Sequence, residues 1–378
     1  MFQKMVCLWL VVFIGAYGCM TVDQKGNRLN RSEEKAVTLV QPDGSYPAKP
    51  LEKEKIVVKV VQSGVKSLAD FPTVQEGLDY NLNHMLSLGR QACEEGKKPD
   101  FILYHEFPLT GYHPGSRAEK LKFTVTIPGP ETDRLGKLAK ACDAYIIFGS
   151  YARDDDWPDH ILSLNTVIGR DGKVVKKYWK SRNIKRLYAD REITTTTIEA
   201  VRDKYRAKYG IDEEFPVLQT EFGNIAVSTV QFDPFIFAAF AMKGTEIMFR
   251  TATLFDESDV ISNAWTHNYY SAMSNITLPE GLPYRGGNSV IVSPKGDILA
   301  RDPSTSKDDI IEAEIPITEF RKGRKIPNYA LEMVQPVFQQ YQQEIPLNHL
   351  DLPVDQFPKT GPEMKDHFDR ISRFLNKE

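Results

Sequence analysis

The sequence predicts an α/β fold in which two stacked β-sheets carry helices on their outer faces. Strands and helices alternate along the central part of the chain, and some consecutive strands form hairpins. A second block of the same kind begins at Val217, which gives two β-rich halves. The chain has 378 residues, and a single domain of this class often takes roughly 250 of them. We therefore expect one main domain, over residues 56–324, with an extension at each end.

The N-terminus predicts an export signal. Lys4 precedes the apolar run Met5–Gly18, which ends in small residues and is shorter than the roughly 20 residues that span a bilayer. Residues 1–19 are therefore expected to be a signal peptide, with a retained anchor or a buried core helix as alternatives. The residues Ala16-Tyr17-Gly18-Cys19 resemble a bacterial lipobox. We expect an exported protein that is either periplasmic or held at the membrane by a lipid on Cys19.

The first half of the domain follows a polar segment, residues 20–55, which has no apolar periodicity and is expected to be a flexible linker. The domain then starts with an apolar strand at Ile56–Val61. Helices are expected at Val74–Glu95 and Glu131–Ala144. The other strands of this half are expected at Asp100–Tyr104, Tyr145–Tyr151, His160–Ile168 and Val174–Trp179, the last two joined by the turn Arg170-Asp171-Gly172-Lys173.

The second half begins with the tight turn Phe222-Gly223-Asn224 and the strand Ile225–Val230. It continues with a helix at Phe235–Lys243, a strand at Glu246–Phe249 and a helix at Ser258–His267. Three short strands are expected to close the second sheet, at Ser289–Ser293, Ile298–Arg301 and Ile310–Ile315. Residues 325–378 are rich in Pro, Gln and charge, so we expect them to wrap the surface of the domain or of a partner subunit.

The charge balance restricts the class of ligand. There are 48 basic and 51 acidic residues, which gives neither the basic footprint of a nucleic-acid binder nor a broad surface for anionic lipid. The histidines do not have the spacing of metal ligands on one helix, so no metal and no cofactor is expected. A small neutral or weakly charged ligand fits this composition better.

Two cysteines, Cys93 and Cys142, lie in the domain. Two are too few to indicate a disulfide framework. We expect each to pack as a small apolar side chain within a helix, and one bridge between them is the alternative.

An acidic and a basic residue stand at the ends of two predicted strands. Glu106 ends an apolar strand and is followed by a loop that contains Gly111 and Tyr112, while Lys180 ends the strand after the turn at Gly172. Active sites of α/β sheets lie at the carboxyl ends of strands. Either residue alone is equally typical of a solvated strand end. The order of the two residues in the chain and the spacing of the motifs around them favour a functional role for the pair.

These segments resemble the carbon–nitrogen hydrolase superfamily of nitrilases and amidases over about Ile56–Arg324, and aliphatic amidases in particular. The resemblance rests on His105-Glu106, where the family has Pro-Glu, and on Gly111-Tyr112, Gly172–Lys180, Ala241–Glu246, Ala264–Asn275 and Gly287–Asp297. It implies a four-layer α-β-β-α sandwich that forms homodimers. It also implies hydrolysis of a non-peptide carbon–nitrogen bond in a small amide or nitrile.

The resemblance implies a reaction for which this chain lacks one group. In the family a glutamate takes the proton of a cysteine, the thiolate attacks the substrate carbon, and a lysine stabilises the anionic oxygen. Glu106 and Lys180 match the first and last of these residues, but Gln231, in Gln231-Phe232-Asp233, fills the position of the cysteine. Counting from Gly223 gives Val230 instead, and counting back from Pro234 gives Ser228. None of these residues carries a thiol.

A glutamine cannot be the nucleophile, so hydrolysis is expected to be weak or lost. The alternative is a catalytically inactive protein that binds a small amide, nitrile or carboxylate-like ligand, or acts as a scaffold at the cell envelope. Substrate binding is assigned by the resemblance to Tyr112, Asp233 and Asn268. Two further family positions differ, because Tyr188 replaces a second glutamate of amidases and the helix after Pro234 lacks the family's arginine.

Overall fold

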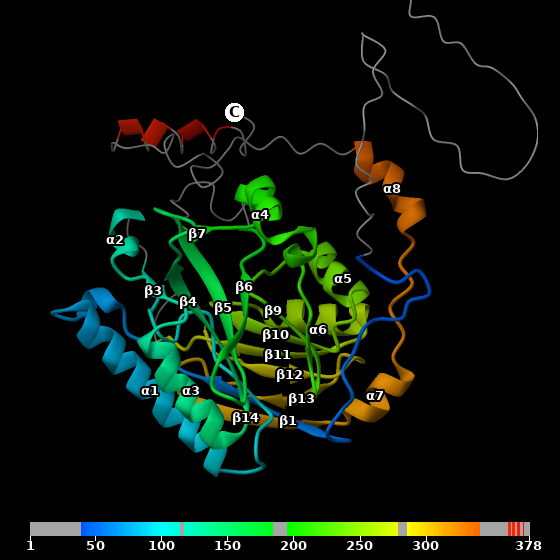
Figure 1. Cartoon of the computed structure of the whole chain (residues 1–378), viewed down its shortest axis with the longest axis horizontal. Helices are drawn as coiled ribbons and strands as arrows, with labels where there is room; N and C mark the ends of the chain where they lie inside the picture. The colour runs from blue at the N-terminus through cyan, green and yellow to red at the C-terminus, as the bar shows by residue number, and fades with distance from the viewer. Residues whose placement is uncertain are drawn as a thin grey trace, which may run out of the picture. The chain divides into compact units, whose positions relative to one another are not determined.

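The computed structural model describes residues 39–113, 117–183, 195–278 and 286–340, together with single positions between 362 and 373. The described residues from Val40 onward belong to one compact unit, which contains two β-sheets with helices on their outer faces (Figure 1). The predicted fold class is confirmed. None of the described helices is long and apolar enough to cross a membrane. The predicted signal segment, Cys19 and Tyr188 lie outside the described residues.

The first sheet has the strand order β14-β1-β2-β4-β5-β6, with β3 paired to β4 and β7 to β5. Its strands are β1 (Ile56–Gln62), β2 (Phe101–Leu103), β3 (Val125–Thr126), β4 (Tyr145–Arg153), β5 (Ile161–Ile168), β6 (Val174–Trp179), β7 (Thr195–Thr196) and β14 (Asp309–Ile315). Strands β1, β2 and β4 are parallel, and α1 (Val74–Glu94) and α3 (Pro130–Cys142) connect them. Both helices lie side by side on the outer face of this sheet (Figure 1).

The second sheet has the order β13-β12-β11-β10-β9-β8. Its strands are β8 (Leu218–Thr220), β9 (Gly223–Ser228), β10 (Ile247–Ala252), β11 (Tyr270–Asn275), β12 (Val290–Val292) and β13 (Ile298–Arg301). Strands β9, β10 and β11 are parallel and are joined by α5 (Pro234–Met242) and α6 (Glu257–His267). The other helices are α2 (Arg117–Leu121), α4 (Arg202–Tyr209), α7 (Ile317–Gly323) and α8 (Leu331–Gln340), with short 3-10 turns at Leu68–Asp70, Glu199–Val201 and Ile211–Glu214.

The inner faces of the two sheets pack against each other and form the main core. Phe101 of β2 contacts Phe249 of β10, with 5.2 Å between the ring centroids, and Val58 and Val60 belong to the same fully buried cluster. The alternate residues of the first sheet, such as Ile102, point to the other side and pack under α1 and α3. This alternation follows from the two-residue repeat of a strand that is buried on both faces.

One predicted strand belongs to the other sheet. The expectation that Ile310–Ile315 closes the second sheet is wrong, because β14 pairs antiparallel with β1, from Ile56 opposite Ile315 to Gln62 opposite Asp309. Short apolar strands in sequence usually pair with their neighbours, but residues 302–308 carry the chain across to the first sheet. The Lys59 ammonium, buried in β1, then pairs with Glu312 at 3.1 Å.

The chain contacts the domain before Ile56. Tyr46 donates a hydrogen bond to Glu246 at 2.9 Å, and Asn224 donates one to the carbonyl of Pro47 at 2.8 Å. Glu52 pairs through its backbone with Glu221. The contacts of the folded unit therefore begin within the predicted linker, and the described part of that linker lies against the second sheet from Tyr46 onward.

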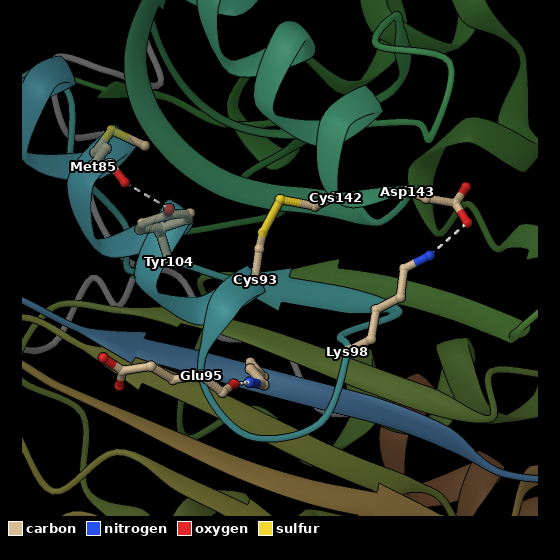
Figure 2. The surroundings of a disulfide bond; sticks show 8 residues. Met85, Cys93, Glu95, Lys98, Tyr104, Cys142 and Asp143 are labelled. Carbon is tan, nitrogen blue, oxygen red and sulfur yellow. Dashed lines mark hydrogen bonds and ion pairs between the residues drawn. A yellow bond between two sulfur atoms is a disulfide. The ribbon is translucent and has the colours of Figure 1, made fainter.

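The two domain cysteines form a disulfide bond (Figure 2). The expectation that Cys93 and Cys142 pack separately as small apolar side chains is wrong, and the alternative of one bridge is correct. Cys93 lies in the last turn of α1 and Cys142 ends α3, where each helix turns back toward the start of a parallel strand. Neighbouring helices that run in the same direction bring their C-terminal ends together. That proximity is a tertiary effect which the spacing of two cysteines does not reveal.

Loss of this bond should lower stability without changing the fold. The bridged residues are 49 apart in sequence, and closing a loop of that length contributes about 2–4 kcal/mol through the unfolded state. We expect the double variant Cys93→Ala/Cys142→Ala to show a clearly lower Tm by calorimetry. Dithiothreitol should lower the Tm of the parent to that of the variant and leave the variant unchanged. The same Tm for the parent and the variant, each with and without dithiothreitol, would contradict this expectation.

Candidate active site

The carboxyl ends of the parallel strands of both sheets lie at the same edge of the sandwich. Ser63, directly after β1, forms a parallel bridge with Ile276, directly after β11, so the two sets of strands run in the same direction. Glu106 follows β2, and the turn with Gln231 follows β9. Lys180 follows β6, which is antiparallel to β5 and hence parallel to β4. The three predicted catalytic positions therefore share one edge of the molecule.

Glu106 and Lys180 are in contact. The Lys180 ammonium lies 3.4 Å from Oε1 of the Glu106 carboxylate, and the Ser163 hydroxyl of β5 donates to the same oxygen at 3.3 Å. Glu106 is buried and Lys180 is largely buried. A carboxylate removed from water needs such partners to remain charged. The predicted pair of acid and base is thus a real structural pair.

The backbone of Glu106 is held close to β4. The Gly149 N–H donates to the carbonyl of His105 at 3.1 Å, and a Cβ at Gly149 would lie 2.2 Å from the carbonyl oxygen of Glu106. Only glycine permits this approach. The close contact fixes the loop from which the carboxylate projects.

His105, which directly precedes Glu106, is a buried neutral side chain. Burial lowers its pKa to about 3, and its Nδ1 accepts a hydrogen bond from the Phe107 N–H at 3.2 Å. Nε2 therefore carries the proton, and within the described residues this buried atom has no hydrogen-bond partner. His105 shapes the backbone around Glu106 and does not supply a charge at neutral pH.

Gln231 lies in the turn that joins β9 to α5. The turn spans residues 229–233, and Phe232 adopts the left-handed region with a φ of 58°. The side-chain oxygen of Gln231 is buried, and no described residue donates a hydrogen bond to it. Ser228 and Val230 are the two alternative registers. Ser228 ends β9, and its hydroxyl accepts a hydrogen bond from the Val230 N–H at 3.2 Å.

The predicted substrate-binding residues separate into two groups. Tyr112 is half exposed in the loop after Glu106, with its ring 6.3 Å from that of Phe107. Asp233 lies two residues after Gln231, accepts a hydrogen bond from Arg182 at 2.7 Å and lines a cavity of about 520 Å³. The other lining residues of this cavity are Ser181, Arg182, Ile198, Glu199, Arg202, Glu214, Phe215, Phe235, Ile236 and Ala239.

Asn268 lies at the opposite edge of the sandwich. It ends α6 in the left-handed region, just before the start of β11, and its side chain donates to the carbonyl of Lys325 at 3.0 Å. A residue before β11 cannot reach a turn after β9 in a parallel arrangement of this length. The geometry therefore gives Asn268 the role of a helix cap that holds the C-terminal segment.

Three residues around the site were not predicted from the sequence. Ser163 is one of several polar side chains in a buried strand, so the sequence does not distinguish it. Arg250 and Asp259 form a buried ion pair at 2.6 Å beside the turn of Gln231. A lone arginine within the apolar strand Ile247–Ala252 is the signal that could have indicated this pair.

A family model described as carbon-nitrogen hydrolase matches residues 60–325. The chain belongs to the carbon–nitrogen hydrolase family. An omega-amidase of Xenopus tropicalis is 25% identical over 260 residues, which cover 65% of this chain and 86% of that protein. A bifunctional nitrilase/nitrile hydratase of Lupinus angustifolius is 22% identical over 306 residues, or 74% of this chain and 76% of the relative.

Solved structures of an amidase from Nesterenkonia sp. AN1 have the same fold. One of them shares 17% sequence identity at a TM-score of 0.53, and covers 75% of this chain and 97% of the amidase. Another, at 16% identity and the same TM-score of 0.53, covers 76% of this chain and 100% of the amidase. That second structure shows an acetamide moiety added covalently at the active site cysteine of the amidase. At this level of identity the likeness concerns the fold.

Removing the ammonium should leave the Glu106 carboxylate buried without a counter-ion. We expect Lys180→Met to lower the free energy of unfolding by about 2–3 kcal/mol, measured by urea denaturation. The double variant Glu106→Gln/Lys180→Met should recover part of the loss. The control is Lys177→Met. Lys177 lies on β6, the strand that precedes Lys180, pairs with Asp154 at 3.5 Å and is more exposed than Lys180, so its loss should cost about 0.5 kcal/mol. Equal costs for both lysines would contradict a specific role of the buried pair.

Proposed function

We propose that this protein is an exported member of the carbon–nitrogen hydrolase family whose nucleophile position no longer carries a thiol. Hydrolysis of a small amide or nitrile is then weak or lost, and the site is kept for binding a small amide- or carboxylate-like ligand. One observation carries the proposal: Glu106 and Lys180 remain paired at 3.4 Å, whereas the domain has no free cysteine. Its two cysteines are joined to each other, and no cysteine follows Cys142 in the sequence.

The retained pair suits an amide or a carboxylate without any covalent step. An ammonium donates charge-assisted hydrogen bonds to a carbonyl or carboxylate oxygen, and a carboxylate accepts them from an amide NH₂. Lys180 and Glu106 together therefore match both ends of a primary carboxamide. The cavity next to Asp233 includes Ser181, directly after Lys180, but Glu106, Lys180 and Gln231 do not line it. The ligand proposal therefore rests on the charged pair and not on this cavity.

Covalent catalysis needs a nucleophile that the available base can activate. A thiol beside the Lys180 ammonium would be such a group, but the carboxamide of Gln231 has no proton that Glu106 could take to give a nucleophile. Ser228 and Thr229 carry hydroxyls whose pKa is far above that of a thiol. A lone carboxylate is too weak a base to activate either of them efficiently.

The disulfide supports the export part of the proposal. Disulfide bonds form and persist in oxidising compartments and are rare in the cytosol of mesophiles. A bond between α1 and α3 therefore agrees with the export signal that the N-terminal sequence predicts. We also propose attachment to the membrane through a lipid on Cys19, and this part of the proposal is supported only by the lipobox-like sequence pattern.

We also propose that two copies associate through the outer helices. Phe235 of α5 and Phe338 of α8 are exposed, and their rings lie 5.0 Å apart. Met333 and Val337 of α8 are exposed as well. Exposed apolar side chains gathered on neighbouring helices are typical of a protein interface.

Restoring the thiol tests the functional proposal. We expect purified parent protein to release no ammonia from short amides and nitriles, and Gln231→Cys to release it at least 10-fold faster than the matched control Gln231→Ser. Addition of Glu106→Gln to Gln231→Cys should abolish the gain, because the thiol then loses its base. If the parent hydrolyses these substrates and Glu106→Gln does not, the proposal that activity has been lost is wrong. If small carboxamides and carboxylates neither raise the Tm of the parent nor inhibit Gln231→Cys, the ligand proposal fails.

Charge in the exposed apolar surface should separate the two copies. We expect sedimentation equilibrium to give twice the chain mass for the parent and at least a 10-fold higher dissociation constant for Val337→Glu/Phe338→Glu. Val175→Glu, on the edge strand β6 and also exposed, is the control and should leave the mass unchanged. A parent that is monomeric at tens of micromolar would refute the proposed dimer.

A further inference from the structure

The buried ion pair of Arg250 and Asp259 holds the backbone on both sides of Gln231. Arg250 of β10 is 0% exposed, and its Nη2 donates to the Val230 carbonyl at 2.5 Å and to Asp259 Oδ2 at 2.6 Å. The other oxygen of Asp259, in the first turn of α6, accepts the Phe232 N–H at 3.0 Å. The pair therefore contacts the residue before Gln231 and the residue after it.

The turn adopts a conformation that needs such support. Phe232 has a φ of 58°, which costs a side chain with a Cβ roughly 1–2 kcal/mol. The side chain of Phe232 is 60% exposed, so its packing does not impose this conformation. The hydrogen bond from its N–H to Asp259 is a backbone interaction that stabilises this conformation.

The position of Arg250 is not explained by stability alone. Its Nε and Nη1 atoms are buried, and within the described residues they have no hydrogen-bond partner. The guanidinium also lies 4.1 Å from the centre of the Phe237 ring. Burying a charge with unmatched donors costs free energy, and an apolar residue of similar volume is often at least as stable in such a place. A local cost of this kind is expected where geometry serves a site.

We propose that Arg250 and Asp259 are positioning residues, which preset the turn 230–232 so that residue 231 is presented at the strand edge shared with Glu106 and Lys180. The ion pair fixes Val230 and Phe232 independently of which side chain stands at 231. The turn is thus held in one conformation although no thiol stands at position 231. The inference rests on the proposed function, because that proposal places the site at residue 231. The effect of the ion pair on the turn can be measured without an activity assay.

The first test uses the natural chain and hydrogen exchange. We expect Asp259→Asn to speed exchange of the Phe232 amide at least 10-fold, with little change at residues 247–249 in the centre of the second sheet. Arg321→Met is the matched control. It breaks another ion pair of that sheet, between Arg321 and Glu246 at 2.7 Å, and Glu246 precedes β10 at the opposite edge. Unchanged exchange at Phe232 in Asp259→Asn would overturn the proposal.

The second test follows the reactivity of a thiol placed in the turn. In the Gln231→Cys background, Arg250→Met should slow alkylation by iodoacetamide at least 10-fold or shift the pH midpoint of the alkylation rate. Arg250→Lys should restore part of the rate. Arg321→Met should leave both quantities unchanged even if it lowers the Tm equally. Equal effects of Arg250→Met and Arg321→Met would mean a structural role only. If Arg250→Met does not fold, Asp259→Asn in the same background gives the same comparison.

These outcomes are separate from those of the functional proposal. If Gln231→Cys gains no hydrolysis but its alkylation rate depends on Arg250 and Asp259, the positioning role stands and the functional proposal fails. If Gln231→Cys hydrolyses amides at the same rate with and without Arg250, the positioning role fails alone.

Discussion

The apolar packing of one sheet on the other determines where every functional group of this protein lies. Phe101 against Phe249 is one contact of that interface, and the bridge between Ser63 and Ile276 shows that the parallel strands of both sheets run the same way. Because strands that run together end together, loops from separate parts of the chain gather at one edge. Glu106 and Gln231 are more than 120 residues apart in sequence, with Lys180 between them. The packing of the two sheets brings all three to the same edge of the sandwich.

Local patterns were sufficient to predict most of the helices and strands. Helices α1 and α3 and the hairpin of β5 and β6 follow directly from periodicity and from the turn at Gly172. Glu106 and Lys180 each end a strand, but the resemblance of the surrounding motifs to the family was needed to single out the pair. The sheet to which β14 belongs and the disulfide between Cys93 and Cys142 could not be predicted. Both depend on which distant segment of the chain lies next to β14 or next to each cysteine.

The site residues that were missed or misplaced share the same cause. Ser163 donates to Glu106, which lies 57 residues away in sequence. Arg250 donates to Asp259 and to the backbone of Val230, 9 and 20 residues away, and each of these partners belongs to a different element of the fold. Asn268 was assigned to substrate binding by family resemblance, but its place before β11 puts it at the far edge. A motif gives the identity of a residue, whereas the direction of the adjoining strand decides which edge it reaches.

The bond between Cys93 and Cys142 has a chemical consequence beyond stability. It occupies both sulfur atoms that the segment from Ile56 to Arg324 obtains from cysteine. Hydrolases that depend on a catalytic thiolate are inactivated when peroxide or an electrophile modifies that sulfur. Under the proposed function, the site of this protein offers no thiolate to such reagents, so this route of inactivation is closed to it.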